Sequence, residues 1–118
     1  MRWRKQLQPV ITLTASATQE IRFARRLGHA VSGVALVSVY RNTGGTVTFT
    51  MLSASHTAVR ADAMNSFWLS VGQGAVATTG LARIAIADFG EWVRWDAVLA
   101  SGQADFSILL ELDDRKAD

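Results

Sequence analysis

Residues 92–112 read WVRWDAVLASGQADFSILLEL, two runs of alternating side chains around a short polar break. Alternation with a period of two is typical of strands that have one face on a core. The break at residues 101–103 has hairpin-loop length and a glycine where a positive φ is needed. The stretch therefore predicts a hairpin that closes a core. Its predicted inward residues are Val93, Trp95, Ala97, Leu99, Phe106, Ile108, Leu110 and Leu112.

Trp92 falls on the other, mixed face of the first run, beside Arg94 and Asp96. An aromatic ring with an exposed edge next to charges can bind a ligand, because its face is apolar and its indole N–H is polar. A half-buried tryptophan in a sheet is also commonly packing at the rim of a core. Both interpretations stay open for Trp92, whereas Trp95 is predicted to lie in the core.

Two stretches upstream have the same strand character. Residues 46–51 alternate threonines with Val47, Phe49 and Met51, and the preceding NTGG is a turn, so a hairpin is predicted over residues 40–51. Residues 31–40 are apolar on both alternating faces, as in a strand that is covered from two sides. Since a short chain has little to cover both faces, we expect part of this strand to meet a second subunit.

The other segments complete an all-β pattern. Residues 10–18, 66–71 and 81–89 are predicted strands, and the glycine-rich residues 72–80 a flexible loop. Residues 19–27 fit strand and helical spacing alike, with strand favoured by their surroundings. Together these elements predict an antiparallel β-sandwich, jelly-roll-like, of seven to eight strands. One short helix is allowed around residues 56–64.

A length of 118 residues predicts one domain that can hold its own core. Hydrophobic residues make up 49% and charged residues 19%, an ordinary globular balance. The sequence contains no cysteine and no apolar run of the roughly 20 residues that a membrane helix needs. We expect a basic arm at residues 1–8, a sandwich domain at 9–113 and a charged tail at 114–118, in a chain without a signal peptide.

The net charge of +2 is unevenly distributed: residues 1–41 sum to +6 and residues 42–118 to −4. Such asymmetry suggests a basic arm that meets an anionic partner. The arm would contact the acidic end of a neighbouring subunit or nucleic acid, and would tune assembly rather than hold the fold. The alternative is that folding interleaves the two parts and mixes their charges.

No pattern for catalysis or metal binding is apparent. His29 and His56 have no cysteine or glutamate at metal-ligand spacing, and no G-x-S-x-G motif supports a nucleophilic serine. Residues 72–80 lack the Lys-Ser/Thr ending of a phosphate-binding loop. We therefore expect a protein that is not an enzyme and holds no cofactor or metal.

Three stretches carry a resemblance to a known class of proteins: VSGVALVSVYRNTGGTVTFTMLSAS, SFWLSV and FGEWVRWDAVLASGQADFSILLEL. Their order resembles that of small β-sandwich structural proteins of tailed phages and related particles, such as capsid decoration and virion-surface subunits. The resemblance covers residues 31–112 and departs at residues 56–65, where HTAVRADAMN replaces an aspartate-rich turn. It implies a self-assembling or capsid-bound subunit without catalysis, in a virion or assembled particle and otherwise cytoplasmic.

Two other classes remain open from the sequence. A carbohydrate-binding module would stack sugar rings on Trp92, Trp68 and Tyr40, and a nucleic-acid binder would use the basic arm. For the favoured assembly role, the expected partners are other copies of the chain or a particle protein. The candidate interface residues are Arg2, Trp3, Arg4, Lys5, Val34, Leu36, Tyr40, Trp92, Asp113 and Asp114.

Overall fold

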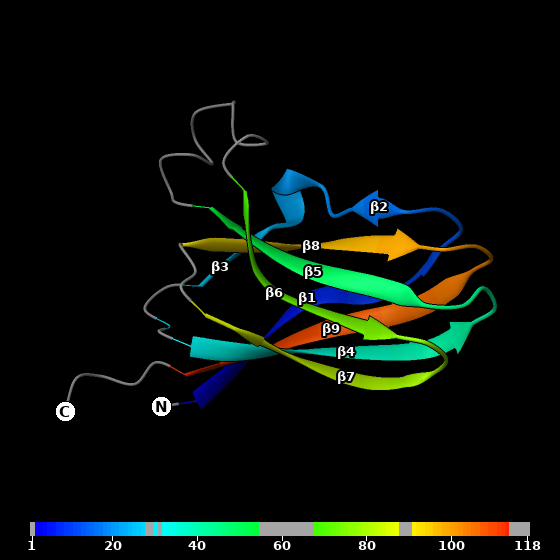
Figure 1. Cartoon of the computed structure of the whole chain (residues 1–118). Helices are drawn as coiled ribbons and strands as arrows, with labels where there is room; N and C mark the ends of the chain where they lie inside the picture. Colours follow the sequence, from blue (N-terminus) through cyan, green and yellow to red (C-terminus); the bar gives the residue numbers. More distant parts are fainter. Residues whose placement is uncertain (1, 28–29, 31, 55–67, 88–90, 114–118) are drawn as a thin grey trace.

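The computed structural model describes residues 2–27, 30, 32–54, 68–87 and 91–113, and they form two antiparallel sheets that face each other (Figure 1). The first sheet has the strand order β1-β9-β4-β7, and the second has β2-β8-β5-β6 with β3 also on β8. The predicted all-β antiparallel sandwich is confirmed. The elements are β1 (Arg2–Leu13), β2 (Ala17–Thr18), the 3₁₀ turn η1 (Ile21–Phe23), β3 (Arg25–Arg26), β4 (Ser32–Asn42), β5 (Val47–Ala54), β6 (Leu69–Val76), β7 (Gly80–Ile86), β8 (Trp92–Leu99) and β9 (Ala104–Asp113).

The core lies between the sheets and is built from the faces that alternation marks as apolar. Phe106 sits at its centre, with ring centroids 4.9 Å from Phe49 and 5.1 Å from Trp95 in edge-to-face geometry. Edge-to-face pairs add about 0.5–1.5 kcal/mol beyond the area that they bury. The predicted inward residues of β5, β8 and β9 are all buried, so the assignment of faces from the sequence is confirmed.

The two predicted hairpins are wrong, because each turn joins strands of different sheets. β4 belongs to the first sheet and β5 to the second, and β8 belongs to the second and β9 to the first. Trp95 and Phe106 therefore meet across the core rather than as neighbours in one sheet. Alternation specifies which face of a strand is buried, but it does not specify the strand that receives its hydrogen bonds.

These two turns dock against each other at one end of the sandwich. The Thr43 amide donates to the Gln103 carbonyl at 2.9 Å, and the Gln103 amide donates to Thr43 Oγ1 at 2.8 Å. A Cβ on Gly44 would lie 1.6 Å from the Ser101 carbonyl oxygen, and Gly102 has a φ of +70°. Both glycines are therefore required by the close approach of the turns or by the backbone conformation.

Residues 2–8 do not form a free arm. They belong to β1, which pairs with β9 from Arg2 opposite Asp113 to Leu13 opposite Ala104. Leu7 is 2% exposed, so this segment contributes to the core. The charged side chains between its apolar positions gave the segment the composition of a solvated arm. Pro9 is tolerated because β1 is an edge strand with a register shift between Gln8 and Ile11.

Two further segments differ from expectation. Residues 19–27 contain η1 and the two-residue strand β3 instead of one strand. Residues 72–76 continue β6 rather than forming a loop, and only residues 77–79 turn into β7. The predicted helix at residues 56–64 and the tail at 114–118 lie outside the described residues.

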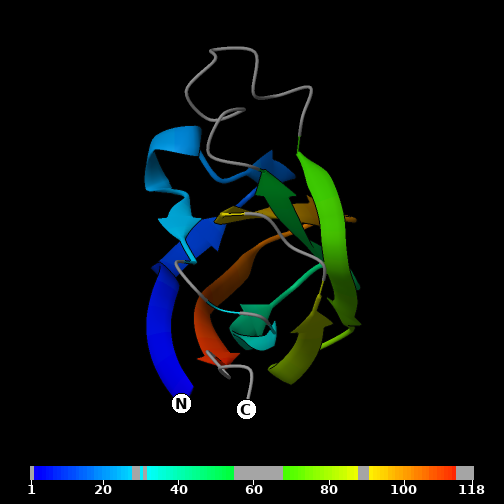
Figure 2. The ribbon, with the colours of Figure 1, turned by 90° about the vertical axis from the view of Figure 1, so that its left-hand side faces the viewer.

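The sandwich closes on one side where β6, the edge strand of the second sheet, lies beside β7, the edge strand of the first (Figure 2). A Cβ on Gly72 would lie 2.5 Å from the Ala85 carbonyl oxygen, so this glycine permits the contact. The Ala87 amide also donates to the Val71 carbonyl at 3.3 Å. On the opposite side, β1 faces residues 17–26 (Figure 2), and side chains rather than paired strands join the two there. None of the helical structure described is long and apolar enough to cross a membrane.

Candidate functional site: an apolar sheet face and an edge cleft

One face of the first sheet points away from the core and carries apolar side chains. We call it the outer face; Tyr40 and Leu81 are 56% and 61% exposed on it, and Val34 and Leu36 are half-buried. β4 thus has a buried inward face and an outward face that the described chain leaves open. The outer face is formed by Arg4 of β1, Val34, Leu36 and Tyr40 of β4, Leu81 and Arg83 of β7, and Leu109 and Glu111 of β9.

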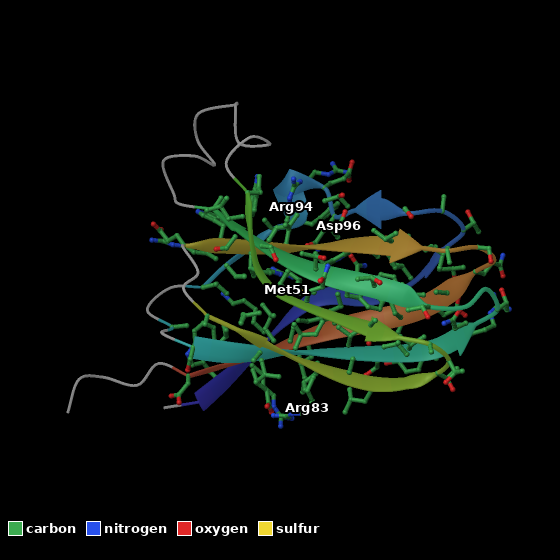
Figure 3. The ribbon with its side chains drawn as sticks, viewed as in Figure 1. Met51, Arg83, Arg94 and Asp96 are labelled. Atoms are coloured by element: carbon green, nitrogen blue, oxygen red, sulfur yellow. The ribbon has the colours of Figure 1, made fainter. Side chains whose placement is uncertain are left out.

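Charged groups surround the apolar part of the outer face. Arg4 donates from Nε and Nη2 to Glu111 Oε2, the shorter contact being 2.9 Å. Arg83 projects from the opposite edge (Figure 3) and forms no ion pair among the described residues. A shallow hollow of about 120 Å³ lies beside Arg83 and Glu111 and also reaches Asp113. The face therefore combines apolar surface, a cation with no ion pair to any residue that the structure describes, and nearby carboxylates.

The structure separates the candidate residues of the supposed arm. Arg4 lies on the outer face, but Trp3 is half-buried and packs against the core. Lys5 sits 5.3 Å from the centre of the Trp3 ring and donates to the Arg26 carbonyl at 2.7 Å. Asp113 ends β9 opposite Arg2 in the register. Asp114 and the side chain of Arg2 are beyond what the structure describes.

Trp92 is half-buried and belongs to a small second cluster with Trp68, Ala24, Ala54 and Leu52. Trp68 is only 9% exposed. Both tryptophans belong to the side of the second sheet, whereas Tyr40 lies on the outer face of the first. The three aromatic side chains therefore do not share one face, and they do not form the platform that sugar binding requires.

Arg94, which shares the mixed face of β8 with Trp92, is 8% exposed. Its Nη1 donates to the Gln19 carbonyl at 3.1 Å, and its guanidinium carbon lies 4.6 Å from the centre of the Trp68 ring. Burial lowers the pKa of Arg94, and the charge of neighbouring Asp96 partly raises it again. Arg94 and Asp96 both lie on the second sheet, on the far side of the sandwich from Arg83 (Figure 3).

Folding interleaves the basic and acidic parts of the chain. Among the described residues, three ion pairs each join an arginine of residues 1–41 to a carboxylate of residues 42–118. The alternative in which the charges mix therefore accounts for much of the sequence asymmetry. The pairs are Arg4–Glu111 at 2.9 Å, Arg26–Glu91 at 3.0 Å and Arg41–Asp105 at 3.3 Å.

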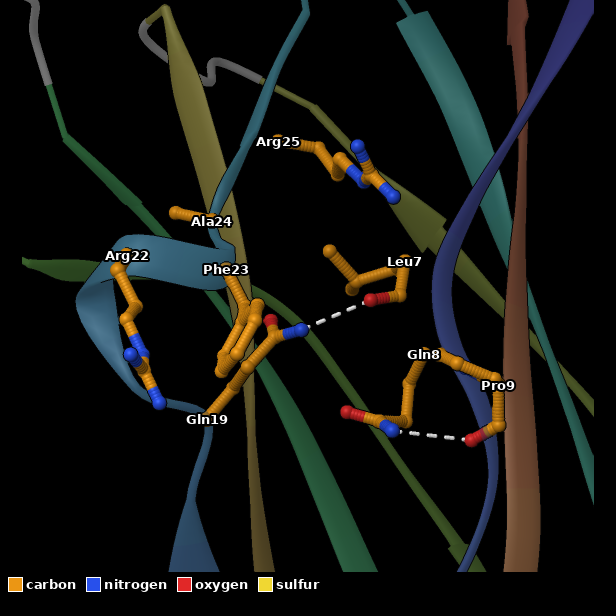
Figure 4. A pocket seen from close by; sticks show the side chains of 8 residues that line it. All are labelled: Leu7, Gln8, Pro9, Gln19, Arg22, Phe23, Ala24 and Arg25. Atoms are coloured by element: carbon orange, nitrogen blue, oxygen red, sulfur yellow. Dashed lines mark hydrogen bonds between the residues drawn. The ribbon is translucent and has the colours of Figure 1, made fainter.

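A cleft of about 410 Å³ opens between β1 and residues 19–25 (Figure 4). The Gln19 amide donates from Nε2 to the Leu7 carbonyl at 2.8 Å, and Arg25 Nε donates to the Gln6 carbonyl at 3.0 Å. These side chains cap carbonyl groups on the edge of β1, which would otherwise be open to another strand. Apart from the ambiguous periodicity of residues 19–27, no sequence pattern indicates this cleft.

Within the described ranges, no group of three or more histidine, cysteine, aspartate or glutamate side chains is placed to hold a metal ion. His29 and His56 fall outside those ranges. The geometry is that of a β-sandwich protein with one open apolar sheet face and a cleft at the edge of β1.

Comparisons place this fold among known structures. No protein-family model and no curated protein matches the sequence. The chain is similar to the crystal structure of the SPBc2 prophage-derived protein YomS, with a TM-score of 0.56 and 10% identity over 94% of this chain and 93% of that one. At this identity the similarity shows a shared fold. It supports the expected resemblance to phage proteins only at the level of fold, through one protein of prophage origin.

Two other structures are less similar. A structure titled for the disulfide-linked pili of Bacillus endospore appendages has a TM-score of 0.49 and 18% identity over 95% of this chain and 89% of that one. PirA has a TM-score of 0.44 and 9% identity over 95% and 93%.

Proposed function

We propose that the protein is a non-catalytic structural subunit, and that it assembles with copies of itself through the outer face of the first sheet. The observation that carries the proposal is the exposure of Tyr40 and Leu81 next to half-buried Val34 and Leu36. Contiguous apolar surface bordered by polar groups is typical of protein–protein contacts. A stable contact covers about 800 Å² on each partner, an area that a four-stranded sheet face can offer.

The charges on this face favour a second copy as the occupant. Arg83 stands on β7 without an ion-pair partner in the described residues, and carboxylates stand on β9, which β4 separates from β7. When two identical faces dock about a two-fold axis, a contact between two different residues forms twice, once in each direction. Arg83 of each copy can then approach Glu111 or Asp113 of the other. The same patch thus supplies both halves of a complementary surface.

A particle of phage or related origin is the proposed setting. This part of the proposal rests on the fold shared with a prophage-derived protein and on the sequence resemblance to phage structural subunits. In that setting, the outer face contacts further copies or a lattice protein. Electron microscopy of the native assembly is the direct test, since it shows whether the chain sits in a particle or filament.

Light scattering on a concentration series tests self-assembly in solution. We expect a mass above that of one chain at high micromolar concentration, and a return to one chain in Leu81→Lys. The matched control is Leu69→Lys on β6, because Leu69 is 70% exposed but lies in the second sheet. A monomer at every concentration, or equal loss of assembly in both variants, would contradict docking through the outer face.

A further inference from the structure

The cleft at the edge of β1 shares no lining residue with the outer face and has a composition of its own. Its walls are apolar where Leu7, Pro9 and Phe23 contribute, and Phe23 is 51% exposed at the rim. Its volume of about 410 Å³ falls within the range of roughly 300–1,000 Å³ found for ligand sites. The volume and the apolar lining of the cleft therefore suit a small apolar group. The polar side chains that line it determine the chemical class of the ligand.

A buried acceptor without a partner faces this cleft. Gln19 is 4% exposed, and its Nε2 is engaged by the Leu7 carbonyl (Figure 4). Its Oε1 is buried and has no hydrogen-bond partner among the described residues. The amide cannot be reversed, because Oε1 would then face the Leu7 carbonyl oxygen. Buried polar atoms are normally paired, so this oxygen calls for a donor from outside the chain.

The neighbouring polar groups are cationic. Arg22 and Arg25 line the cleft, and no carboxylate does. Arg22 is paired with Glu20 at 3.2 Å, whereas Arg25 uses only Nε, on the Gln6 carbonyl, and forms no ion pair in the described part of the chain. Guanidinium groups with free N–H donors favour carboxylates. The charge of the cleft thus selects an anionic ligand.

We propose that the cleft binds the carboxyl-terminal residue of a peptide chain when that residue is apolar. Its backbone N–H donates to Gln19 Oε1, its side chain packs between Leu7 and Phe23, and its terminal carboxylate accepts from the Arg25 guanidinium. The last residue of a peptide carries an N–H donor, an apolar side chain and a carboxylate close together. These three groups complement the unpaired acceptor, the apolar walls and the guanidinium of the cleft. This binding is independent of assembly through the outer face.

The test is a titration of the ¹⁵N-labelled chain, followed by NMR amide shifts. The probe N-acetyl-leucine has the N–H, the apolar side chain and the carboxylate, and a ligand of its size should bind with a Kd of about 1–10 mM. We expect saturable shifts at residues 7–9 and 19–25. N-acetyl-leucinamide lacks the negative charge, and N-acetyl-N-methyl-leucine lacks the N–H. Each should bind about fivefold more weakly or worse.

Two exposed positions test the cleft without disturbing the core. Phe23→Ala and Arg25→Met should each weaken binding about fivefold. Arg41→Met, at an exposed arginine outside the cleft, should leave it unchanged. A tripeptide that ends in leucine should bind at least as tightly as N-acetyl-leucine. The proposal is overturned by an absence of saturable shifts, by shifts centred elsewhere, by equal affinity for acid and amide, or by failure of the tripeptide to bind.

Discussion

The guanidinium carbon of Arg94 lies 4.6 Å from the centre of the Trp68 ring, and these two side chains are 8% and 9% exposed. A buried cation over an aromatic face gains about 2 kcal/mol or more when water is excluded. The ring, the Gln19 carbonyl and the charge of Asp96 together offset part of the desolvation of Arg94. This contact explains why the mixed face of β8 is covered at Arg94, although Val98 on the same face is 53% exposed.

Substitutions of Trp68 should separate its packing from its indole N–H. Trp68→Ala should lower the free energy of unfolding by about 3–5 kcal/mol, as for other large buried aromatics. Trp68→Phe should cost only about 1 kcal/mol, because an aromatic face remains beneath Arg94. The indole N–H has no partner among the described residues, so its loss adds little. Urea unfolding followed by far-UV circular dichroism measures both, and equal costs would contradict the role of the ring.

The carboxylate of Asp96 should matter for stability because it lies near a buried cation. Asp96→Asn should cost about 1–2 kcal/mol, since an amide does not compensate the charge of Arg94. Asp105→Asn is the matched control: each aspartate accepts from a threonine hydroxyl of a neighbouring strand, at 2.5 Å from Thr18 and 2.6 Å from Thr12. The arginine beside Asp105 is exposed, so its cost should be about 0.5 kcal/mol or less.

A double-mutant cycle checks the source of this difference. In an Arg94→Met background, the cost of Asp96→Asn should fall to that of the Asp105→Asn control. If the cost of Asp96→Asn is unchanged in that background, the effect comes from the Thr18 hydroxyl and not from the cation.

Removal of residues 1–8 should destabilise the domain strongly. The deletion takes away buried Leu7 and half of β1, and it exposes Leu110 and Leu112 of β9. Since small domains are stable by only about 5–15 kcal/mol, we expect the truncated chain to unfold or to lose most of its stability. The single substitution Leu7→Ala should already cost about 3 kcal/mol, against less than about 0.5 for exposed Gln6→Ala. An unchanged melting temperature of the truncated chain would contradict this prediction and would support the hypothesis that residues 1–8 are an arm outside the fold.

Closure of the sandwich at β6 and β7 should depend more on Gly72 than on Gly74. A Cβ on Gly72 meets the Ala85 carbonyl oxygen at 2.5 Å, and backbone cannot easily move aside. A Cβ on Gly74 meets the Ile84 side chain at 2.8 Å, which can shift. We expect Gly72→Ala to cost about 2–3 kcal/mol and Gly74→Ala about 1 kcal/mol. Thermal unfolding of both variants measures the order, and the reverse order would contradict the contact.

Part of the outer face was predictable from the sequence, whereas the cleft was not. Val34, Leu36 and Tyr40 were identified because the strand that contains them is apolar on both alternating faces, and the structure places all three on the outer face. Leu81 and Arg83 join them only through the pairing of β4 with β7, which no local pattern specifies. The cleft was missed because Leu7 and Gln19 come together only when residues 19–25 fold over the edge of β1.

The all-β class and the inward residues of the long strands can be read from the amino-acid sequence alone. These follow from the period-two alternation, which is a local property of the chain. The three-dimensional fold was needed to show that β4 and β5, and likewise β8 and β9, belong to opposite sheets, and that residues 2–8 are part of β1. Strand pairing joins segments far apart in the chain through backbone groups that every residue has. Side-chain identity therefore encodes the face of a strand much more strongly than its partner.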